Sequence, residues 1–335
     1  MNIAVLGAGT WGIALAKLLS ENRHSVTVWS ALLCELDSLE NGGKHKNLPD
    51  VDIPREIKYE RSLEKAVRGK DAVLFTVASA YVRQVVSSCA TYLSENQLLI
   101  DAAKGLEADT LFTMTEVIED EMKKCGVSFE PKLIALSGPT HAEEVARNIP
   151  TSVVSACRDE TCAEKTAELF MNSCMRVYTN TDVKGVEICG AFKNIIALAA
   201  GMIRGMGYGD NTLAMLMTRG IAEMTRIGLA LGCKRRTFMG LAGIGDLIVT
   251  CTSRHSRNNR CGELIGMGLS YEEASKKVGM VVEGYYALDA AAQLCEKYSV
   301  SMPIISAVYD VIKRGADPKE AVRSLMTRAM RSELD

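Results

Sequence analysis

The sequence has little of what nucleic-acid binding and metal binding require. Its 335 residues include 39 basic and 41 acidic side chains, so it lacks the excess of positive charge expected of a nucleic-acid-binding protein. Aromatic residues make up only 5% of the chain, too few to suggest a base-stacking platform. The four histidines are scattered, and no zinc-ligand spacing emerges. We therefore predict neither a nucleic-acid partner nor a bound metal.

The cysteines do not form a recognisable disulfide pattern either. No CxxC pair occurs among the 11 cysteines, and the closest two, Cys157 and Cys162, have four residues between them. Disulfide frameworks are typical of smaller secreted domains, so reduced thiols in a cytoplasm are the better interpretation. The N-terminus, MNIAVLGAG, lacks the basic and apolar regions of a signal peptide. We expect a soluble, cytoplasmic protein without membrane insertion, and its length favours two domains.

The start of the chain predicts a dinucleotide-binding unit. An apolar run at 3–6 ends in GAGTWG, and a helical pattern follows over 13–19. In a GxGxxG motif between a strand and a helix, Gly7 permits the tight turn and Gly9 lets the backbone approach a pyrophosphate. Gly12 lets the helix pack on the strand. The helix N-terminus then faces the phosphates with its unpaired N–H groups. An ordinary glycine-rich turn is the less favoured alternative.

Further short apolar runs alternate with helix-length segments, as in a parallel sheet with right-handed crossovers. These runs lie at 26–29, 72–76, 98–100, 132–136, 151–156 and 175–178. Ligands bind at the carboxyl ends of such strands, where Lys104 and Gly138-Pro139-Thr140 are expected. We predict an NAD(P)-binding Rossmann domain over 1–181, with the boundary near Asp182.

The end of the second predicted strand leaves the choice between NAD and NADP open. An NAD-binding unit usually has Asp or Glu there for the ribose hydroxyls, whereas this chain has Ser30-Ala31-Leu32. No adjacent arginine marks a site for the 2′-phosphate of NADP. Lys44, His45 and Lys46 could reach such a phosphate from the following loop, although a solvated basic loop is the simpler interpretation.

One apolar window in the second half contains a lysine. Residues 188–203, ICGAFKNIIALAAGMI, carry one formal charge, Lys193, followed by Asn194. The window is too short to span a membrane, and Gly190, Lys193 and Gly201 interrupt its apolar run. Desolvation lowers the pKa of a lysine toward neutrality, which suits a residue that accepts and donates a proton near pH 7. A snorkelling lysine or a structural ion pair would give the same pattern, and this window alone does not separate the two interpretations.

Two other stretches place polar groups in unusual surroundings. Asp246 lies among apolar residues, where a carboxylate requires a cation or several donors, and Lys193 is an obvious candidate. The segment 250–260, TCTSRHSRNNR, combines three arginines with hydroxyl and amide groups, which suits phosphate oxygens. The solvated face of a helix is an equally good interpretation of those arginines. Apolar residues recur at helical spacing over 213–231, 287–298 and 304–312, so we predict a helical substrate-binding domain over 182–335.

Together these motifs resemble the NAD(P)-dependent glycerol-3-phosphate dehydrogenases of the soluble bacterial type. The resemblance covers nearly the whole chain and is carried by GAGTWG at 7–12, AKG at 103–105, SGPTHA at 137–142, GVEICGAFKN at 185–194, GIGDLIVTCTS at 243–253, HSRNNR at 255–260 and VVEG at 281–284. It implies a Rossmann domain with a doubly wound, mostly parallel sheet, followed by an all-α domain of the 6-phosphogluconate-dehydrogenase-like type. The active site is expected between the two.

The resemblance also implies an activity and a set of site residues. The family interconverts sn-glycerol 3-phosphate and dihydroxyacetone phosphate with NAD(P)(H), supplying glycerol 3-phosphate for phospholipid synthesis. Lys193 is the implied proton acceptor, with Lys104 and Asp246 as further catalytic residues. Implied substrate contacts are Lys104, Gly138, Thr140, Lys193, Asn194, Asp246, Thr250, Ser256, Arg257 and Asn258. Implied cofactor contacts are Gly7, Gly9, Thr10, Trp11, Gly12, Ser30, Lys104, Ala142, Arg257, Val281 and Glu283.

Some positions depart from the family pattern. Ser30 lies where members often have an arginine, although the family as a whole leans toward NADP. Ala78, His141 and Phe192 replace a common proline, phenylalanine and leucine. The alternatives are a related two-domain dehydrogenase of a hydroxy acid or hydroxyacyl thioester, with His141 as its base, and a non-catalytic NAD(P)-binding redox sensor. A homodimer would fit a helical second domain of this build, but no dimer seam can be read from the sequence.

Overall fold

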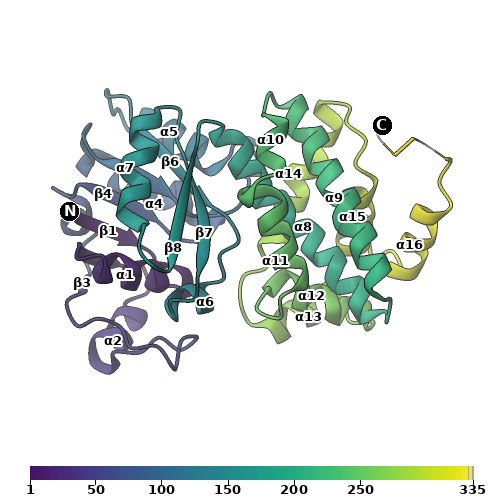
Figure 1. The fold of residues 1–335 in the computed structure, drawn as a ribbon, viewed down its shortest axis with the longest axis horizontal. Coiled ribbons are helices and arrows are strands. Elements are labelled where there is room, and N and C mark those ends of the chain that lie inside the picture. Colours follow the sequence, from purple (N-terminus) through teal and green to yellow (C-terminus); the bar gives the residue numbers. More distant parts are fainter. Residues whose placement is uncertain (331, 334–335) are drawn as a thin grey trace.

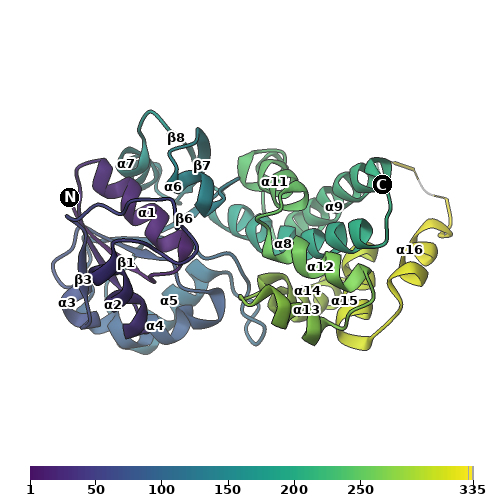
Figure 2. The ribbon, with the colours of Figure 1, turned by 90° about the horizontal axis from the view of Figure 1, so that it is seen from below.

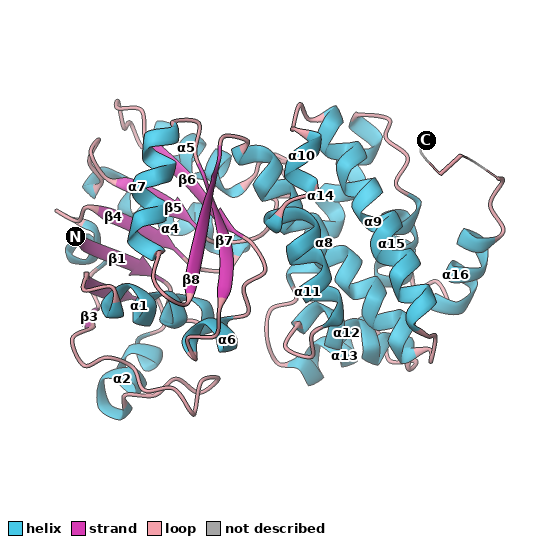
Figure 3. Ribbon diagram, viewed as in Figure 1, coloured by secondary structure: helices cyan, strands magenta, loops and turns pink. Residues whose placement is uncertain are grey.

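The protein has an α/β half and a helical half that lie side by side (Figure 1). The computed structural model describes residues 1–330 and 332–333. Within these described residues, all strands belong to the first half, and the regular elements of the second half are helices (Figure 3). The predicted fold class, a Rossmann domain followed by an all-α domain, is confirmed.

The strands of the described residues form one doubly wound sheet in the order β3-β2-β1-β4-β5-β6-β7-β8. They are β1 (Asn2–Leu6), β2 (Ser25–Trp29), β3 (Lys58–Glu60), β4 (Ala72–Phe75), β5 (Leu98–Asp101), β6 (Lys132–Ser137), β7 (Thr151–Ala156) and β8 (Met175–Asn180). All neighbouring strands are parallel except β6 and β7. The strand order reverses between β1 and β4, which creates the crevice where ligands bind in such sheets. The edge strand β3 is not among the predicted strands.

Helices cover both faces of the sheet (Figure 2). In β1, Ile3 and Val5 belong to the core on one face, and Ala4 and Leu6 to the core on the other. Both faces are therefore apolar, which explains why the strands read as continuous apolar runs. The helices of this half are α1 (Thr10–Glu21), α2 (Leu33–Gly42), α3 (Leu63–Val67), α4 (Val82–Cys89), α5 (Met114–Lys124), α6 (Ala142–Ala146) and α7 (Glu160–Phe170).

The helical half is built around one buried helix, α8 (Val183–Gly205). The other helices of this half are α9 (Asp210–Ala230), α10 (Arg235–Phe238), α11 (Asp246–Thr252), α12 (Arg257–Gly266), α13 (Tyr271–Val278), α14 (Glu283–Lys297), α15 (Pro303–Arg314) and α16 (Pro318–Met326). Glycines let α8 and α12 approach closely, because a Cβ on Gly201 would lie 2.0 Å from the carbonyl oxygen of Asn259. This close crossing brings the start of α12 next to the middle of α8.

The two halves join at Asp182. β8 ends at Asn180 and α8 begins at Val183, with the Asp182 side chain as its N-cap. Asp182 Oδ1 accepts from the Gly185 N–H at 3.1 Å, and Oδ2 accepts from the Lys234 N–H at 2.8 Å. We propose the division between domains 1–181 and 182–335 at this capped junction.

Among the described residues, α8 has the length and apolar composition of a membrane span. The sixteen-residue window read from the sequence thus belongs to a longer helix of 23 residues. Its apolar window is entirely buried inside the protein. Burial by other helices, rather than shortness, is what identifies α8 as the core helix of a soluble protein.

Candidate active site

A cluster of three charged side chains joins the two halves. Lys193, from the middle of α8, donates to Asp246 Oδ1, and Lys104, from the loop after β5, donates to Asp246 Oδ2 at 2.8 Å. Asp246 is the first residue of α11 and follows a π-helical turn over 241–245, a local geometry that is frequent at functional sites. Lys193 and Asp246 are 5% and 1% exposed. The pairing expected between them is therefore present, and Lys104 extends it across the domain boundary.

Hydroxyl and carbonyl groups fix both lysines. Lys193 Nζ also donates to Thr250 Oγ1 at 2.9 Å, and Thr250, one helical turn after Asp246, donates back to the Asp246 carbonyl oxygen at 2.6 Å. Lys104 Nζ donates to the Gly138 carbonyl oxygen at 3.0 Å and to Thr140 Oγ1 at 3.3 Å. The loops after β5 and β6 and the helices α8 and α11 therefore meet at one point, as the predicted set requires.

Burial gives the cluster its electrostatic character. Desolvation and the positive charge of Lys104 together lower the pKa of Lys193 to about 7, against the opposing effect of Asp246. Burial acts to raise the pKa of Asp246, but the two ammonium groups outweigh it and hold that pKa below its usual value. One permanent carboxylate thus faces two lysines, one of which can exchange its proton near neutral pH.

A network of amides lies beside the cluster. Asn258 Nδ2 donates to Asn194 Oδ1 at 2.9 Å, and Asn258 Oδ1 accepts from the Gly284 N–H at 2.9 Å. Asn194 Nδ2 donates to the Gly190 carbonyl oxygen at 3.2 Å. These bonds connect α8, α12 and α14 at Asn194, the residue that follows Lys193. The side chains of Asn194 and Asn258 are therefore both held in place by hydrogen bonds.

The arginine-rich segment resolves into two kinds of residue. Arg254 and Arg260 are exposed and fit the solvated face that the sequence allowed, whereas Arg257, the first residue of α12, is half-buried. The hydroxyl of Ser256 is the N-cap of α12 and accepts from the Asn259 N–H at 3.2 Å. Arg257 is therefore the least exposed arginine of this segment, and it lies at a helix N-terminus.

The glycine motif fits a dinucleotide. A Cβ on Gly12 would lie 2.0 Å from the Gly7 carbonyl oxygen, so the turn closes tightly on the helix. Gly9 is the N-cap of α1 and brings no side chain to the first helical N–H groups, and the space beside it is open. The indole Nε1 of Trp11 is buried without a hydrogen-bond partner. Free N–H groups at an uncovered helix N-terminus suit a pyrophosphate.

The second half contributes a segment that contacts the loop after β4. Glu283, the first residue of α14, accepts from Ser79 Oγ at 2.5 Å and from the Ser79 N–H at 3.3 Å. Ser79 follows β4 at the reversal of strand order and is absent from the predicted residues. Its only sequence signal is that position. Val281 is partly exposed beside Glu283, and Ala142 begins α6 on the Rossmann side.

Ser30 lies outside the charged cluster, at the end of β2, where its hydroxyl donates to Glu35 Oε2 at 2.8 Å. All 11 cysteines are free. In the described residues, no group of three or more His, Cys, Asp or Glu side chains could hold a metal ion.

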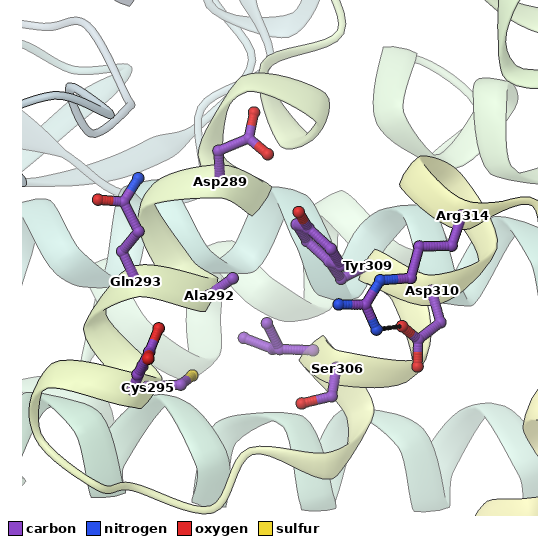
Figure 4. Close-up of a pocket in the computed structure, with 10 residues that line it drawn as sticks. Asp289, Ala292, Gln293, Cys295, Ser306, Tyr309, Asp310 and Arg314 are labelled. Carbon is purple, nitrogen blue, oxygen red and sulfur yellow. Dashed lines mark hydrogen bonds and ion pairs between the residues drawn. The ribbon is translucent and has the colours of Figure 1, made fainter.

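An open pocket of about 420 Å³ lies away from these residues, between α14 and α15 (Figure 4). Its wall includes the ion pair of Arg314 with Asp310, 2.7 Å apart. None of the predicted site residues lines it. This pocket therefore does not coincide with the charged cluster.

The family models of the NAD-dependent glycerol-3-phosphate dehydrogenase N-terminus and C-terminus match residues 2–163 and 182–323. The chain is 54% identical to glycerol-3-phosphate dehydrogenase [NAD(P)+] 2 of Lactobacillus delbrueckii subsp. bulgaricus, covering 99% of this chain and 98% of that one. It is 45% identical to glycerol-3-phosphate dehydrogenase [NAD(P)+] of Agathobacter rectalis, covering 99% and 97%. The crystal structure of glycerol-3-phosphate dehydrogenase from Coxiella burnetii superimposes with a TM-score of 0.92 at 34% identity, covering 98% and 99%.

Proposed function

This chain belongs to the NAD-dependent glycerol-3-phosphate dehydrogenase family, and we propose that Lys193 carries the proton of its reaction. The enzyme interconverts sn-glycerol 3-phosphate and dihydroxyacetone phosphate by hydride transfer, and its general role in the family is to supply phospholipid synthesis. The observation that supports the role of Lys193 is its burial against Asp246, a carboxylate shared with Lys104, with a pKa of about 7.

Each member of the cluster has a separate task. Asp246 and Thr250 occupy two of the three N–H positions of Lys193, which leaves the third for the oxygen on the central carbon of the substrate. In the oxidation direction neutral Lys193 takes the hydroxyl proton, and in the reduction direction it returns that proton. Lys104 supplies positive charge toward the oxygen on which negative charge develops.

The phosphate end of the substrate requires fixed donors. Arg257 presents a guanidinium at the N-terminus of α12, where charge and helix dipole both favour an anion. Asn258 and Asn194 are held by their own hydrogen bonds and bring the phosphate into register with Lys193. Gly138, Thr140 and Ser256 complete the proposed contacts.

Bound NAD(P)(H) supplies or accepts the hydride. The first turn of α1 would bind its pyrophosphate through the N–H groups next to Gly9, Thr10, Trp11 and Gly12. Glu283 and Ser79 close the opposite side of the crevice, with Val281 and Ala142 beside them. Their interdomain bond keeps the cofactor crevice next to Lys104.

The first experiment measures the loss of absorbance of NADH, and separately of NADPH, when dihydroxyacetone phosphate is added. Wild-type protein should oxidise the reduced cofactor. Replacing the lysine, Lys193→Met, should lower turnover by about 10³-fold, within the range for a lost proton-transfer group. Lys184→Met is the matched control, because Lys184 lies on the same helix and pairs with Glu116 at the surface. A folded Lys193→Met protein with near-full turnover would refute the assignment.

The same assay separates the alternatives. Burial and the nearby charge of Lys193 lower the pKa of His141, whose Nε2 bonds to the Val249 carbonyl oxygen at 3.4 Å rather than to Asp246. Our assignment predicts that His141→Phe keeps its turnover, whereas a hydroxyacyl dehydrogenase using this base would lose it. A redox sensor would bind cofactor without consuming it.

Two coarser expectations accompany this proposal. The free cysteines support a reducing compartment, and we propose a cytoplasmic location. A homodimer is proposed from the resemblance alone, and light scattering of the purified protein measures its mass directly.

A further inference from the structure

We propose that Glu35 makes this enzyme prefer NAD(H) to NADP(H), by supplying the ribose-binding carboxylate that is missing from the end of β2. The proposal rests on the proposed function, because it concerns the cofactor of that reaction. It also reverses the lean toward NADP that the family resemblance alone carries.

The carboxylate of Glu35 is held at the end of β2. Ser30 directly follows the strand, is 5% exposed, and donates from Oγ to Glu35 Oε2 at 2.8 Å. Ser30 Oγ itself accepts from the Leu32 N–H at 3.1 Å, which orients the hydroxyl hydrogen of Ser30 toward Glu35. Across the described residues, Glu35 Oε1 has no hydrogen-bond partner within the protein. One carboxylate oxygen is therefore fixed and the other is free to accept from a ligand.

This carboxylate lies beside the glycine motif. His45 is within electrostatic reach of Glu35, and its ring also bonds to the backbone of Ala8 in that motif. Asn47, two residues on, donates to Thr10 Oγ1 at 2.9 Å. The loop after α2 thus lies near Glu35 through His45 and contacts the first turn of α1 through Asn47. A dinucleotide whose pyrophosphate lies on α1 would direct its adenosine ribose toward this point, as dinucleotides do in this fold.

A free carboxylate oxygen treats the two cofactors differently. The 2′-hydroxyl of NAD(H) can donate a hydrogen bond to it. The 2′-phosphate of NADP(H) brings up to two negative charges and no donor of comparable strength, so it would be repelled.

Most nearby cations are already engaged. Arg61, which follows β3, is held by Asp37 at 2.5 Å and by Glu40 at 2.9 Å. Lys44 donates to the Pro49 carbonyl oxygen at 3.1 Å. Burial lowers the pKa of His45, which keeps the ring neutral. Lys46 is exposed and is the cation in this loop whose effect on a phosphate must be measured.

The test titrates purified protein with NADH and with NADPH and follows cofactor fluorescence, so it reads binding rather than turnover. Wild type should bind NADH at least about tenfold more tightly than NADPH, and Glu35→Gln should reduce that ratio by about tenfold. Ser30→Ala should reduce it less, because the carboxylate remains but is no longer oriented. Glu56→Gln is the matched control, since it removes the same charge from an exposed residue of the same domain without touching Ser30 or Arg61, and should leave the ratio unchanged.

The possible failures are distinguishable. Tighter binding of NADPH by wild type, or an unchanged ratio in Glu35→Gln, would overturn the role of Glu35 while leaving the dehydrogenase assignment intact. A larger loss of NADPH binding in Lys46→Met than the gain in Glu35→Gln would assign 2′-phosphate recognition to Lys46 and overturn the proposal as well. Failure to bind either cofactor would refute both this proposal and the proposed function.

Discussion

Two charge clusters of opposite composition flank the loop that carries Lys104. In the first, the carboxylate of Asp246 lies between Lys104 and Lys193. In the second, Arg83 of α4 pairs with Glu107 at 2.6 Å and with Asp120 and Glu121 of α5 at 2.5 and 2.8 Å. Each cluster has one central charge that faces more than one opposite charge.

Burial decides what each excess charge does. The Arg83 side chain is 25% exposed, so water can solvate the surplus of negative charge around it. Hydrogen bonding to Arg83 holds the pKa of Glu107 below its usual value, and bonds to Lys124 and Arg83 do the same for Asp120. Water cannot solvate the ammonium group of Lys193 beside Asp246 in the same way, because the Lys193 side chain is only 6% exposed. The pKa of Lys193 therefore falls to about 7. Only the buried cluster becomes an acid/base.

The largest effect should follow removal of the central charge of the buried cluster. In Asp246→Asn, two ammonium groups would face each other without a counter-ion, and we expect about 3 kcal/mol lower free energy of unfolding at pH 6. Protonated Lys193 would become scarce at neutral pH, so turnover should fall by about 10²-fold or more. Urea unfolding and the dihydroxyacetone phosphate assay measure the two effects.

The pH dependence of that loss sharpens the test. Without Asp246, the folded-state pKa of Lys193 falls below its wild-type value of about 7, so the stability of the variant begins to rise at a lower pH than that of wild type. The stability gap should narrow as the pH approaches 7 and stay constant above it. Asp289→Asn is the control, because Asp289 also accepts from a lysine, Lys313, but is half-exposed. An equal loss in that control would show that burial is not the deciding factor.

A smaller effect is expected from pH alone. Oxidation of glycerol 3-phosphate requires neutral Lys193, so kcat/KM should rise about tenfold per pH unit below an apparent pKa near 7 and level off above it. Reduction requires the protonated form and should decline above the same pKa. Initial rates in both directions across about pH 5.5 to 9, a range that extends beyond the assigned pKa on both sides, test the sign. A profile that is flat in both directions would exclude Lys193 as the titrating group.

The difference between the clusters was only partly predictable from the sequence. The pairing of Lys193 with Asp246 was predicted because each charge is embedded in apolar residues, so each needs the other. The addition of Lys104 depends on how two loops and two helices converge, and only the family resemblance placed it there. The Arg83 cluster left no signal, since its members are ordinary surface residues until the fold brings α4 and α5 together.

Separation along the chain and element length account for the other differences between the predicted and the observed structure. GAGTWG could be interpreted because strand, turn and helix are contiguous in the chain. β3 is missing from the predictions because three residues, KYE, are too short to show alternation. The acid beside β2 was not found because Glu35 comes from the first turn of α2 rather than from the strand end. Ser79 was missed because its partner, Glu283, lies 204 residues away.

The smallest effect should follow removal of the central charge of the exposed cluster. Arg83→Met leaves three carboxylates that water can solvate, so we expect about 1 kcal/mol lower free energy of unfolding. Glu107 lies three residues after Lys104, and its bond to Arg83 helps to hold that loop. Lys104 nevertheless keeps its own bonds to Gly138, Thr140 and Asp246, so turnover should change by less than about threefold.

Urea unfolding and turnover of Arg83→Met, measured beside Asp246→Asn, therefore decide whether the two clusters differ in kind. A loss of turnover as large as that of Asp246→Asn would mean that the Lys104 loop depends on its surface anchor. Catalysis would then require both clusters, because the buried one could not hold Lys104 in place by itself. The expected result, a modest loss of stability with turnover retained, would confine the proton chemistry to the three residues around Asp246.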